Sequence, residues 1–346
     1  MKAWTTPIPL PHPGLDASMT LDPTHPLPTP TNPNHVQIRI HSASLNPADH
    51  KVPETPFLSR FAVSNPYIPG QDFSGVVTAL GSSITDLTIG DAVFGSTCGD
   101  QMGKGTLAEY VVVTRAMVAK IPDVLNGRWD DLAGIGIAGL TALHAIAPNV
   151  KEGDKVFVNG GSGGTGVFSI QIAKALGCFV TTTCSTRNIE LCRSLGADEV
   201  LDYTKVNVVD VMKGKGKVYK LVVDNVGSPA DLYRASNAFT TDAGGGATFV
   251  QVGVSASLQQ LRMVGGNLLR PGFLGGGKAK YDLILAKITK ETPGDLERIA
   301  RWMVEGKVRT VVDETFEFEG AAKGFGKLKT GRARGKVVVR VREGEE

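Results

Sequence analysis

Five glycines gather between Gly160 and Gly166 in the stretch VFVNGGSGGTGVFSIQIAKALG, and an apolar run lies on each side of them. Gly161, Gly163 and Gly166 give the spacing GxGxxG. Glycine permits a tight turn and lets backbone N–H groups approach a pyrophosphate, while the N-terminus of a following helix presents unsatisfied donors to it. A flexible linker would have neither a strand before it nor a helix after it. The pattern therefore predicts a phosphate-binding loop for a dinucleotide.

The next predicted strand bears on which dinucleotide binds. Units that bind NAD place Asp or Glu at the end of that strand, where the carboxylate accepts a hydrogen bond from the ribose 2′-OH. Here the strand ends TTTCSTRN, so Ser185 stands near that position and Arg187 follows, while the first carboxylate is Glu190 in the next predicted helix. A missing acid with a nearby arginine favours a 2′-phosphate, hence NADPH. The alternative is that Arg187 is an ordinary surface residue.

These residues require a scaffold in which strands and helices alternate. From about residue 131 the sequence has this alternation, which favours an α/β fold with a doubly wound parallel sheet, a Rossmann domain. Residues 1–130 are rich in proline and in short alternating runs such as HVQIRIHSASL, which predict a β-rich domain. Residues 290–346 contain a helix and two strands with no sheet of their own, so we expect them to fold back onto the β-rich domain. The predicted domains are therefore 1–130 with 290–346, and 131–289.

Composition excludes several functional classes. The formal net charge of +3 is too small to indicate a nucleic-acid partner. No apolar run reaches the roughly 18 to 20 residues of a membrane span, and the N-terminus lacks the pattern of a signal or transit peptide. The four cysteines form no CxxC pair, which is typical of a reducing compartment. We expect a soluble, cytoplasmic protein.

Several short stretches, in their order and spacing, resemble a known family over nearly the whole chain. In chain order they are NPADHK, PGQDFSGVV, GDAVFG, GTLAEYVVV, AGLTALHA, NGGSGGTG, SLGADEVLDY and GKVVVRV. The sequence is similar to the medium-chain dehydrogenase/reductases, in their zinc-free branch of quinone-oxidoreductase-like and enoyl-reductase-like enzymes. The resemblance implies a GroES-like β-rich domain made from both chain ends, with a Rossmann domain inserted between them.

The resemblance also bears on metal binding. Zinc-dependent relatives carry a catalytic cysteine in the first motif and a GHE triplet in the second. This sequence has Asn46 at the first place and GQD, residues 70–72, at the second, and neither offers a thiolate or imidazole ligand. We therefore expect no metal. Hydride delivery from a nicotinamide to an activated acceptor is then favoured, and the resemblance implies a small-molecule quinone or an α,β-unsaturated carbonyl.

The resemblance further implies which residues act. It places Asn46, Asp49 and Lys51 at the mouth of a cleft between the domains. There, Lys51 would donate a hydrogen bond or proton to the substrate, and Asp49 would orient the substrate or the nicotinamide carboxamide. The alternative is that Asp49 and Lys51 form a surface pair. Asp72 and Glu109 also match family positions, and we expect them to tie the β-rich domain together.

The expected cofactor contacts fall on several parts of the chain. Thr141 matches a position that contacts the nicotinamide, although its hydroxyl could bond its own helix backbone instead, and Tyr203 matches one near the adenosine phosphate. Asn225, Val226 and Gly253 follow strands whose carboxyl ends bind ligands in open parallel sheets. The phosphate-binding residues are expected to be Ser162, Gly163, Gly164, Thr165, Gly166, Ser185 and Arg187.

Together these features predict an NADPH-dependent oxidoreductase, and two alternatives stay open. One is a trans-acting enoyl reductase that partners a biosynthetic synthase and takes a carrier-bound substrate. The other is a non-catalytic NADPH-binding protein with a sensory or structural role. Relatives in this family are commonly dimers, so the resemblance adds a homodimer as an expectation.

Overall fold

The chain divides into two compact units. One comprises Met1–Leu140, Ala286–Gly306 and Thr310–Glu346, and the other comprises Thr141–Leu285 with Lys307–Arg309. The predicted boundaries at residues 130 and 290 stay a prediction for the functional domains. The computed structural model describes residues 1–55, 59–61, 63–98, 103–242, 246–252, 264–267, 276–284, 289 and 291–342.

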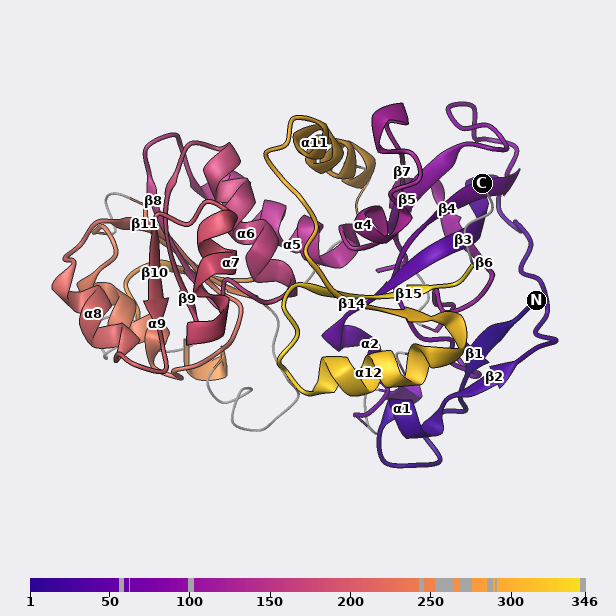
Figure 1. Cartoon of the computed structure of the whole chain (residues 1–346), viewed down its shortest axis with the longest axis horizontal. Coiled ribbons are helices and arrows are strands. Elements are labelled where there is room, and N and C mark those ends of the chain that lie inside the picture. The colour runs from indigo at the N-terminus through magenta and orange to yellow at the C-terminus, as the bar shows by residue number, and fades with distance from the viewer. Residues whose placement is uncertain are drawn as a thin grey trace. The chain divides into compact units, whose positions relative to one another are not determined.

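A seven-stranded sheet forms the centre of the first unit. Its strands are β3 (His35–Leu45), β4 (Asp72–Leu80), β5 (Ala92–Ser96), β6 (Tyr110–Thr114), β7 (Val118–Lys120), β14 (Val312–Glu317) and β15 (Lys336–Arg340), while β1 (Ala3–Thr5) and β2 (Thr20–Asp22) form a separate pair. The order is β14-β15-β3-β4-β5-β7, with β6 beside β3 (Figure 1). Strand β15 pairs with β3, so the C-terminal segment completes the N-terminal sheet.

The long strand β3 shows why the sheet forms at these residues. The alternating Val36, Ile38 and Ile40 are fully buried, in agreement with the period of two in the sequence. Gln37, on the opposite face, is buried as well, and its Nε2 donates to the carbonyl oxygen of Pro28 at 2.6 Å. Because β3 pairs with β15, β4 and β6, it lies inside the sheet, and its polar side chains need partners within the protein.

The first unit also contains helices that pack on this sheet and on one another. They are α1 (Leu15–Ser18), α2 (Pro47–Lys51), α4 (Trp129–Ala133), α11 (Thr292–Val304) and α12 (Ala321–Lys329), and α5 (Gly136–Ile146) begins in this unit and ends in the other. Helix α12 contacts α1, α2 and β15 (Figure 1). Its Phe325 belongs to the same buried core as Ile38. In the described part of the chain, no helix combines the length and hydropathy that a bilayer span requires.

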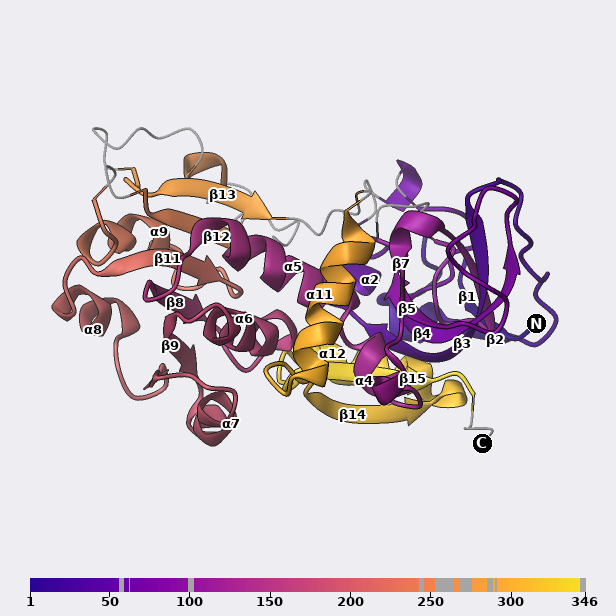
Figure 2. The ribbon, with the colours of Figure 1, turned by 90° about the horizontal axis from the view of Figure 1, so that it is seen from above.

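A six-stranded sheet forms the second unit, and all of its neighbouring strands run parallel. In spatial order the strands are β10 (Glu199–Asp202), β9 (Phe179–Cys184), β8 (Lys155–Asn159), β11 (Tyr219–Asp224), β12 (Thr248–Val252) and β13 (Lys280–Ile284). The helices are α6 (Gly164–Ala175), α7 (Ile189–Ser194), α8 (Val208–Gly214) and α9 (Leu232–Ala235). Strands β8 to β11 lie between α6 and α7 on one side and α8 and α9 on the other (Figures 1 and 2). The predicted α/β class with a doubly wound parallel sheet is confirmed.

Aromatic side chains fill one face of this parallel sheet. The rings of Phe157, Tyr219 and Phe239 meet edge to face with centroids 6.0 to 6.2 Å apart. Val222 of β11 and Met212 of α8 belong to the same buried cluster. Burial of these side chains holds α8 and α9 against the sheet.

The sequence missed one strand of this sheet. From the sequence alone, the glycine-rich stretch VGGNLLRPGFLGGGKAKYD, residues 264–282, is predicted to be a loop. Its last three residues instead begin β13, which pairs with β12 from Lys280 to Ile284. The abundant glycines before it hid the strand, because they weaken any local preference for β structure. Pairing with β12 supplies the stability that the local sequence lacks.

The sheet of the first unit depends on Gly95 in β5. A Cβ at this residue would lie 1.9 Å from the carbonyl oxygen of Met117. We therefore expect Gly95→Ala to lower the free energy of unfolding by about 1–3 kcal/mol, since the strands must separate to admit the methyl group. Urea denaturation measures the change. Gly326→Ala is the matched control: a Cβ there meets nothing within 4 Å, so this change within α12 should stabilise the protein by about 0.5–1 kcal/mol. Equal effects of the two substitutions would contradict the prediction.

Candidate functional site

The glycine-rich loop joins β8 to α6, as the sequence predicts. Gly160 follows β8 with a φ of +83°, a conformation that glycine adopts without strain. The loop is held against β9, because the N–H groups of Gly160 and Gly161 donate to the hydroxyl and carbonyl oxygens of Thr183 at 2.8 and 2.9 Å. Helix α6 begins at Gly164, so the N–H groups of its first turn, which lack partners within the helix, directly follow the loop.

The three glycines of the GxGxxG spacing serve two purposes. A Cβ at Gly161 would lie 2.1 Å from Thr182 Oγ1, and one at Gly166 would lie 2.1 Å from the carbonyl oxygen of Gly160. Close packing of the loop on β9 and of α6 on the loop therefore requires both glycines. A Cβ at Gly163 would meet its nearest atom at 3.8 Å, so this glycine borders open space. A phosphate group fits a backbone cradle of this kind.

Two residues that sequence reasoning missed anchor the loop. Asn159 ends β8, and its Nδ2 donates to Oδ1 of Asp224, which ends β11, at 2.9 Å. The amide oxygen of Asn159 accepts from the Thr183 hydroxyl at 2.7 Å. Burial raises the pKa of the Asp224 carboxyl, whereas the N–H groups of Gly227 and Val226 stabilise its charged form. The three strand ends are thus joined by side chains that lie far apart in sequence.

The residues expected to bind the 2′-phosphate follow β9. Ser185 is half-buried and Arg187 is exposed, in the turn before α7. Tyr203 follows β10, and its N–H donates to the carbonyl oxygen of Cys184 at 3.1 Å, so its backbone lies beside the end of β9. The Tyr203 side chain is 57% exposed. Ser185, Arg187 and Tyr203 therefore lie at the carboxyl ends of β9 and β10, in the same sheet as the strand that carries the glycine-rich loop.

Two buried amide oxygens in this region have no hydrogen-bond partner among the described residues. The Nδ2 of Asn188 donates to the hydroxyls of Ser162 and Ser185 at 3.0 and 3.4 Å, while its Oδ1 has no donor there. The Nδ2 of Asn225 donates to the carbonyl oxygen of Asn159 at 3.2 Å, and its Oδ1 likewise lacks a donor. A buried acceptor without a donor is costly. Ribose hydroxyls are suitable donors, so the residues present fit a dinucleotide.

The remaining residues expected to bind the cofactor lie in α5, in α6 and after β11, or outside the described residues. Thr141 is buried in α5, and Val226 is half-exposed after β11. Thr165 lies in the first turn of α6, where its carbonyl oxygen accepts from the Ser169 hydroxyl. Gly253 lies outside the described residues. The structure gathers at the carboxyl ends of β8, β9, β10 and β11 the residues Ser162, Gly163, Gly164, Thr165, Gly166, Ser185, Arg187, Tyr203, Asn225 and Val226.

In the first unit, Asn46, Asp49, Asp72 and Lys336 form a buried cluster with exposed fractions of 4% or less. The Nδ2 of Asn46 donates to Asp72 Oδ2 at 2.8 Å. The Lys336 ammonium lies 2.6 Å from Asn46 Oδ1 and 3.3 Å from Asp72 Oδ2. The N–H of Ile137 donates to the other Asp72 oxygen at 2.8 Å. The cluster thus joins the end of β3 to the starts of β4, β15 and α5.

Asn46 and Asp49 direct their polar atoms to protein partners. The amide hydrogens of Asn46 go to Asp72 and, at 3.4 Å, to the carbonyl oxygen of Ser44. The backbone N–H of Asn46 donates to Asp49 Oδ2 at 2.7 Å, as part of the capping box that begins α2. The other oxygen of Asp49 accepts from Gln71 Nε2 at 2.8 Å. Both side chains therefore fix the conformation of α2.

Burial raises the pKa of two groups in this region, the carboxyl of Asp49 and the thiol of Cys98. Loss of hydration raises the pKa of the Asp49 carboxyl to about 7, against the effect of the hydrogen bonds from Asn46 and Gln71. Burial, with the charges of Asp72 and Asp49, raises the pKa of the Cys98 thiol to about 12. Cys98 therefore stays protonated near neutral pH and is a poor nucleophile or metal ligand.

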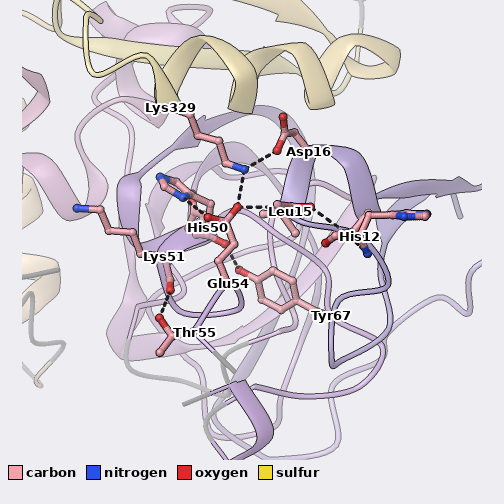
Figure 3. A network of polar contacts seen from close by, with 12 residues as sticks. His12, Leu15, Asp16, His50, Lys51, Glu54, Thr55, Tyr67 and Lys329 are labelled. Carbon is pink, nitrogen blue, oxygen red and sulfur yellow. Dashed lines mark hydrogen bonds and ion pairs between the residues drawn. The ribbon is translucent and has the colours of Figure 1, made fainter. Parts of the chain in front are cut away.

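Lys51 differs from these residues, because its side chain is exposed at the end of α2. Figure 3 shows its ammonium pointing away from a polar network in which the Lys329 ammonium lies between the carboxylates of Asp16 and Glu54. His50 Nδ1 lies 3.2 Å from Glu54 Oε2. Burial lowers the pKa of His50. The network fastens α2 to α12 and α1, so the backbone that carries Lys51 is held from two sides.

The side chains that bind metals are not grouped in the described parts of the chain. Across these residues, no three or more His, Cys, Asp and Glu side chains are placed to hold one metal ion. Asn46, at the place of the cysteine in zinc-dependent relatives, bonds to Asp72 and Lys336. Gln71, at the place of the histidine in their GHE triplet, donates to Asp49.

Comparison with known proteins identifies the family. Residues 32–123 match the model of the alcohol dehydrogenase GroES-like domain, and residues 195–339 match that of the zinc-binding dehydrogenases. The trans-enoyl reductase pgmF of Aspergillus terreus is 43% identical, over 99% of this chain and 97% of that protein. The mouse mitochondrial NAD(P)H oxidoreductase RTN4IP1 is 32% identical, over 89% of this chain and 82% of that protein. The structure of the quinone oxidoreductase from Coxiella burnetii is 28% identical with a TM-score of 0.82, and the alignment covers 99% of each chain.

The chain therefore belongs to the medium-chain dehydrogenase/reductase superfamily, in its quinone-oxidoreductase-like branch. The predicted resemblance and the GroES-like character of the β-rich part are confirmed. The relatives are oxidoreductases, and the chain is an oxidoreductase of this family that takes a nicotinamide cofactor.

The raised pKa of Asp49 makes the unfolding free energy depend on pH. An unfolded Asp titrates near 3.9, whereas the folded carboxyl titrates at about 7, so the folded state binds the extra proton and stability falls as pH rises between these values. The amide in Asp49→Asn does not titrate and carries no such charge. We expect the stability of Asp49→Asn, relative to the unmodified chain, to increase between pH 4 and pH 7 by up to about 4 kcal/mol.

Urea denaturation across this pH range measures that difference. The same change at the exposed Asp123 controls for the loss of one carboxylate from the chain. A stability difference between Asp49→Asn and the unmodified chain that stays constant with pH would contradict the assignment of the raised pKa to Asp49.

Proposed function

We propose that the chain is an NADPH-dependent reductase of carbon–carbon double bonds conjugated to a carbonyl group, with an enoyl compound as substrate. The observation that carries this proposal is the 43% identity to a trans-enoyl reductase over nearly the whole length of both chains. We further propose that a biosynthetic synthase presents the substrate on a carrier. The homodimer and the cytoplasmic location predicted from the sequence belong to the same proposal.

The second unit supplies the cofactor side of the reaction in this proposal. Backbone N–H groups of the loop from Ser162 to Gly166 hold the pyrophosphate, because they are the donors that the glycine conformations leave accessible. Ser185 and Arg187 hold the 2′-phosphate, while Tyr203 lies against the adenosine. Thr141 contacts the nicotinamide. When bound, the reduced nicotinamide supplies the hydride, and zinc takes no part.

The first unit supplies the proton. Reduction of a conjugated double bond requires a proton for the carbon next to the carbonyl and a donor for the developing enolate oxygen. Lys51 presents an exposed ammonium at the end of α2, so we assign the proton to its Nζ. Asn46 and Asp49 act as positioning residues, because their polar atoms already bond to the cluster around Lys336 and to Gln71.

Quinone reduction is the second candidate function. It is supported by the similarity to the Coxiella burnetii quinone oxidoreductase along the whole chain. A phenolate that forms on the quinone needs the same donors as an enolate, so the same residues would serve it. A non-catalytic NADPH-binding role is the alternative from a different class, and it predicts tight NADPH binding without turnover.

Turnover with a panel of acceptors separates these functions. We expect the chain to oxidise NADPH with a 2-enoyl thioester, with kcat/KM at least about tenfold higher than with benzoquinone, since a site for an enoyl substrate also contacts the thioester and its chain, which benzoquinone lacks. Stopped-flow absorbance of NADPH measures the rates. Higher kcat/KM with the quinone would support the second candidate instead, and NADPH binding without acceptor-dependent oxidation would rule out an enzyme.

Lys51→Met tests the proton donor in the same assay. The change should lower kcat by about 100-fold, the usual contribution of a positioned acid, and leave the dissociation constant of NADPH unchanged. Lys323→Met removes another exposed lysine of the first unit and serves as the control. Equal kcat values for the two variants would remove Lys51 from the proposed mechanism.

Arg187→Ala tests the preference for NADPH over NADH. Loss of a charge-assisted hydrogen bond to the 2′-phosphate should raise the dissociation constant of NADPH by about tenfold or more, while that of NADH changes little. Isothermal titration calorimetry measures both constants. Arg193→Ala is the matched control, because Arg193 is an exposed arginine of α7 that pairs with Glu190. Equal weakening of NADPH and NADH by Arg187→Ala would contradict the assigned role.

A further inference from the structure

Asn188 is a buried amide between two serine hydroxyls that come from different loops. It is 5% exposed. Its Nδ2 lies 3.0 Å from Ser162 Oγ, in the glycine-rich loop, and 3.4 Å from Ser185 Oγ, at the end of β9. Its Oδ1 is buried without a partner in the described part of the chain. One amide thus links two of the residues expected to bind the cofactor, and it keeps one unused acceptor.

The direction of these two hydrogen bonds decides what the serines can offer a ligand. A serine hydroxyl has one donor hydrogen and two acceptor lone pairs. Because Nδ2 of Asn188 donates to both hydroxyls, each serine accepts there and keeps its own hydrogen for another partner. A phosphate is rich in acceptors and has few or no donors at neutral pH. Asn188 therefore orients Ser162 and Ser185 as donors to an anion.

Oδ1 of Asn188 complements this arrangement. It is an acceptor without a donor, and a donor group of a ligand is the partner that satisfies it. A ribose that carries a phosphate on one carbon and a free hydroxyl on the next offers both groups at neighbouring positions. The two serine hydroxyls match the phosphate, and the amide oxygen matches the hydroxyl.

The usual structural role of an asparagine at this position, capping of the following helix, does not apply to Asn188. Asn188 stands at the residue before α7, where an asparagine side chain usually caps the helix. Here the side chain makes no capping hydrogen bond. Its amide hydrogens go to the two serines instead, so helix capping does not account for an asparagine at this position.

We propose that Asn188 is a specificity-determining residue for NADPH, which orients the hydroxyls of Ser162 and Ser185 toward the 2′-phosphate and accepts a hydrogen bond from the adjacent ribose hydroxyl. This inference rests on the proposed use of NADPH. It adds a residue to the cofactor site and gives the reason for an amide there: aspartate has the same shape but no hydrogen to donate.

Asn188→Asp tests the proposal in the full-length chain. The carboxylate would accept the serine hydrogens, so the serines could no longer donate to the 2′-phosphate, and its charge would repel that phosphate. We expect the dissociation constant of NADPH to rise on the order of 100-fold, as for the loss of charge-assisted hydrogen bonds, and that of NADH to rise far less. Calorimetric titrations with NADPH, NADH, 2′,5′-ADP and 5′-AMP measure binding without turnover.

Asn207→Asp is the matched control. Asn207 precedes α8 in the same unit, and its side chain accepts from the N–H of Asp210 as a helix cap. The variant carries the same added charge, and aspartate also caps helices, so it should bind both cofactors as the unmodified chain does. A double-mutant cycle between Asn188→Ala and Ser162→Ala tests the link itself: the two effects on NADPH binding should be less than additive.

The outcomes distinguish failure of the proposed NADPH preference from failure of the proposed role of Asn188. If the unmodified chain prefers NADPH and Asn188→Asp keeps that preference, or weakens NADPH and NADH equally, the role of Asn188 is refuted and the proposed cofactor stands. If the unmodified chain binds NADPH and NADH equally, the proposed NADPH preference is wrong and the role of Asn188 falls with it. Loss of the NADPH preference in Asn188→Asp alone, with Asn207→Asp unchanged, supports both.

Discussion

The buried ammonium of Lys336 holds the β-rich unit together. A charge removed from water is costly unless hydrogen bonds and an opposite charge surround it. Lys336 meets both requirements through Asn46 and Asp72, and Asp72 in turn accepts the N–H of Ile137. Removal of any partner would leave a buried group unpaired. Because an unpaired buried group raises the free energy of the folded state, these bonds keep the start of β15, the end of β3 and the start of α5 together within the unit.

This constraint changes the roles of the residues around α2. The family resemblance assigns Asn46 and Asp49 to the reacting groups, yet their donors and acceptors bond to protein groups. Both side chains are at most 4% exposed, which favours the positioning role proposed for them over direct contact with a substrate. The cluster instead fixes helix α2, from which Lys51 extends. The same helix is also linked to α12, because His50 of α2 contacts Glu54 and Glu54 pairs with Lys329. The exposed ammonium is then the polar group of α2 that is accessible to a ligand.

Local patterns predicted the parts of the molecule that depend on neighbours in sequence. The GxGxxG loop was predictable because a strand, a turn and a helix follow one another within a few residues, and β3 because its apolar residues alternate. Lys336, Asp224 and Asn188 were not, since their partners lie far away in the chain and their residue types have no periodic signal. Strand β13 was missed because its stability comes from pairing with β12.

The order of strands in the parallel sheet places one unpaired amide oxygen on each side of the strand that carries the glycine-rich loop. Strand β8 carries the glycine-rich loop, and its two neighbours are β9 and β11. Within the described residues, each neighbour is followed by one buried amide oxygen without a donor: Asn188 after β9 and Asn225 after β11. A dinucleotide has one ribose on each side of its pyrophosphate, and each ribose carries hydroxyl donors. The two acceptors therefore follow the strands on opposite sides of β8, which carries the loop proposed to bind the pyrophosphate. This arrangement favours a ligand with two sugars over a mononucleotide with one.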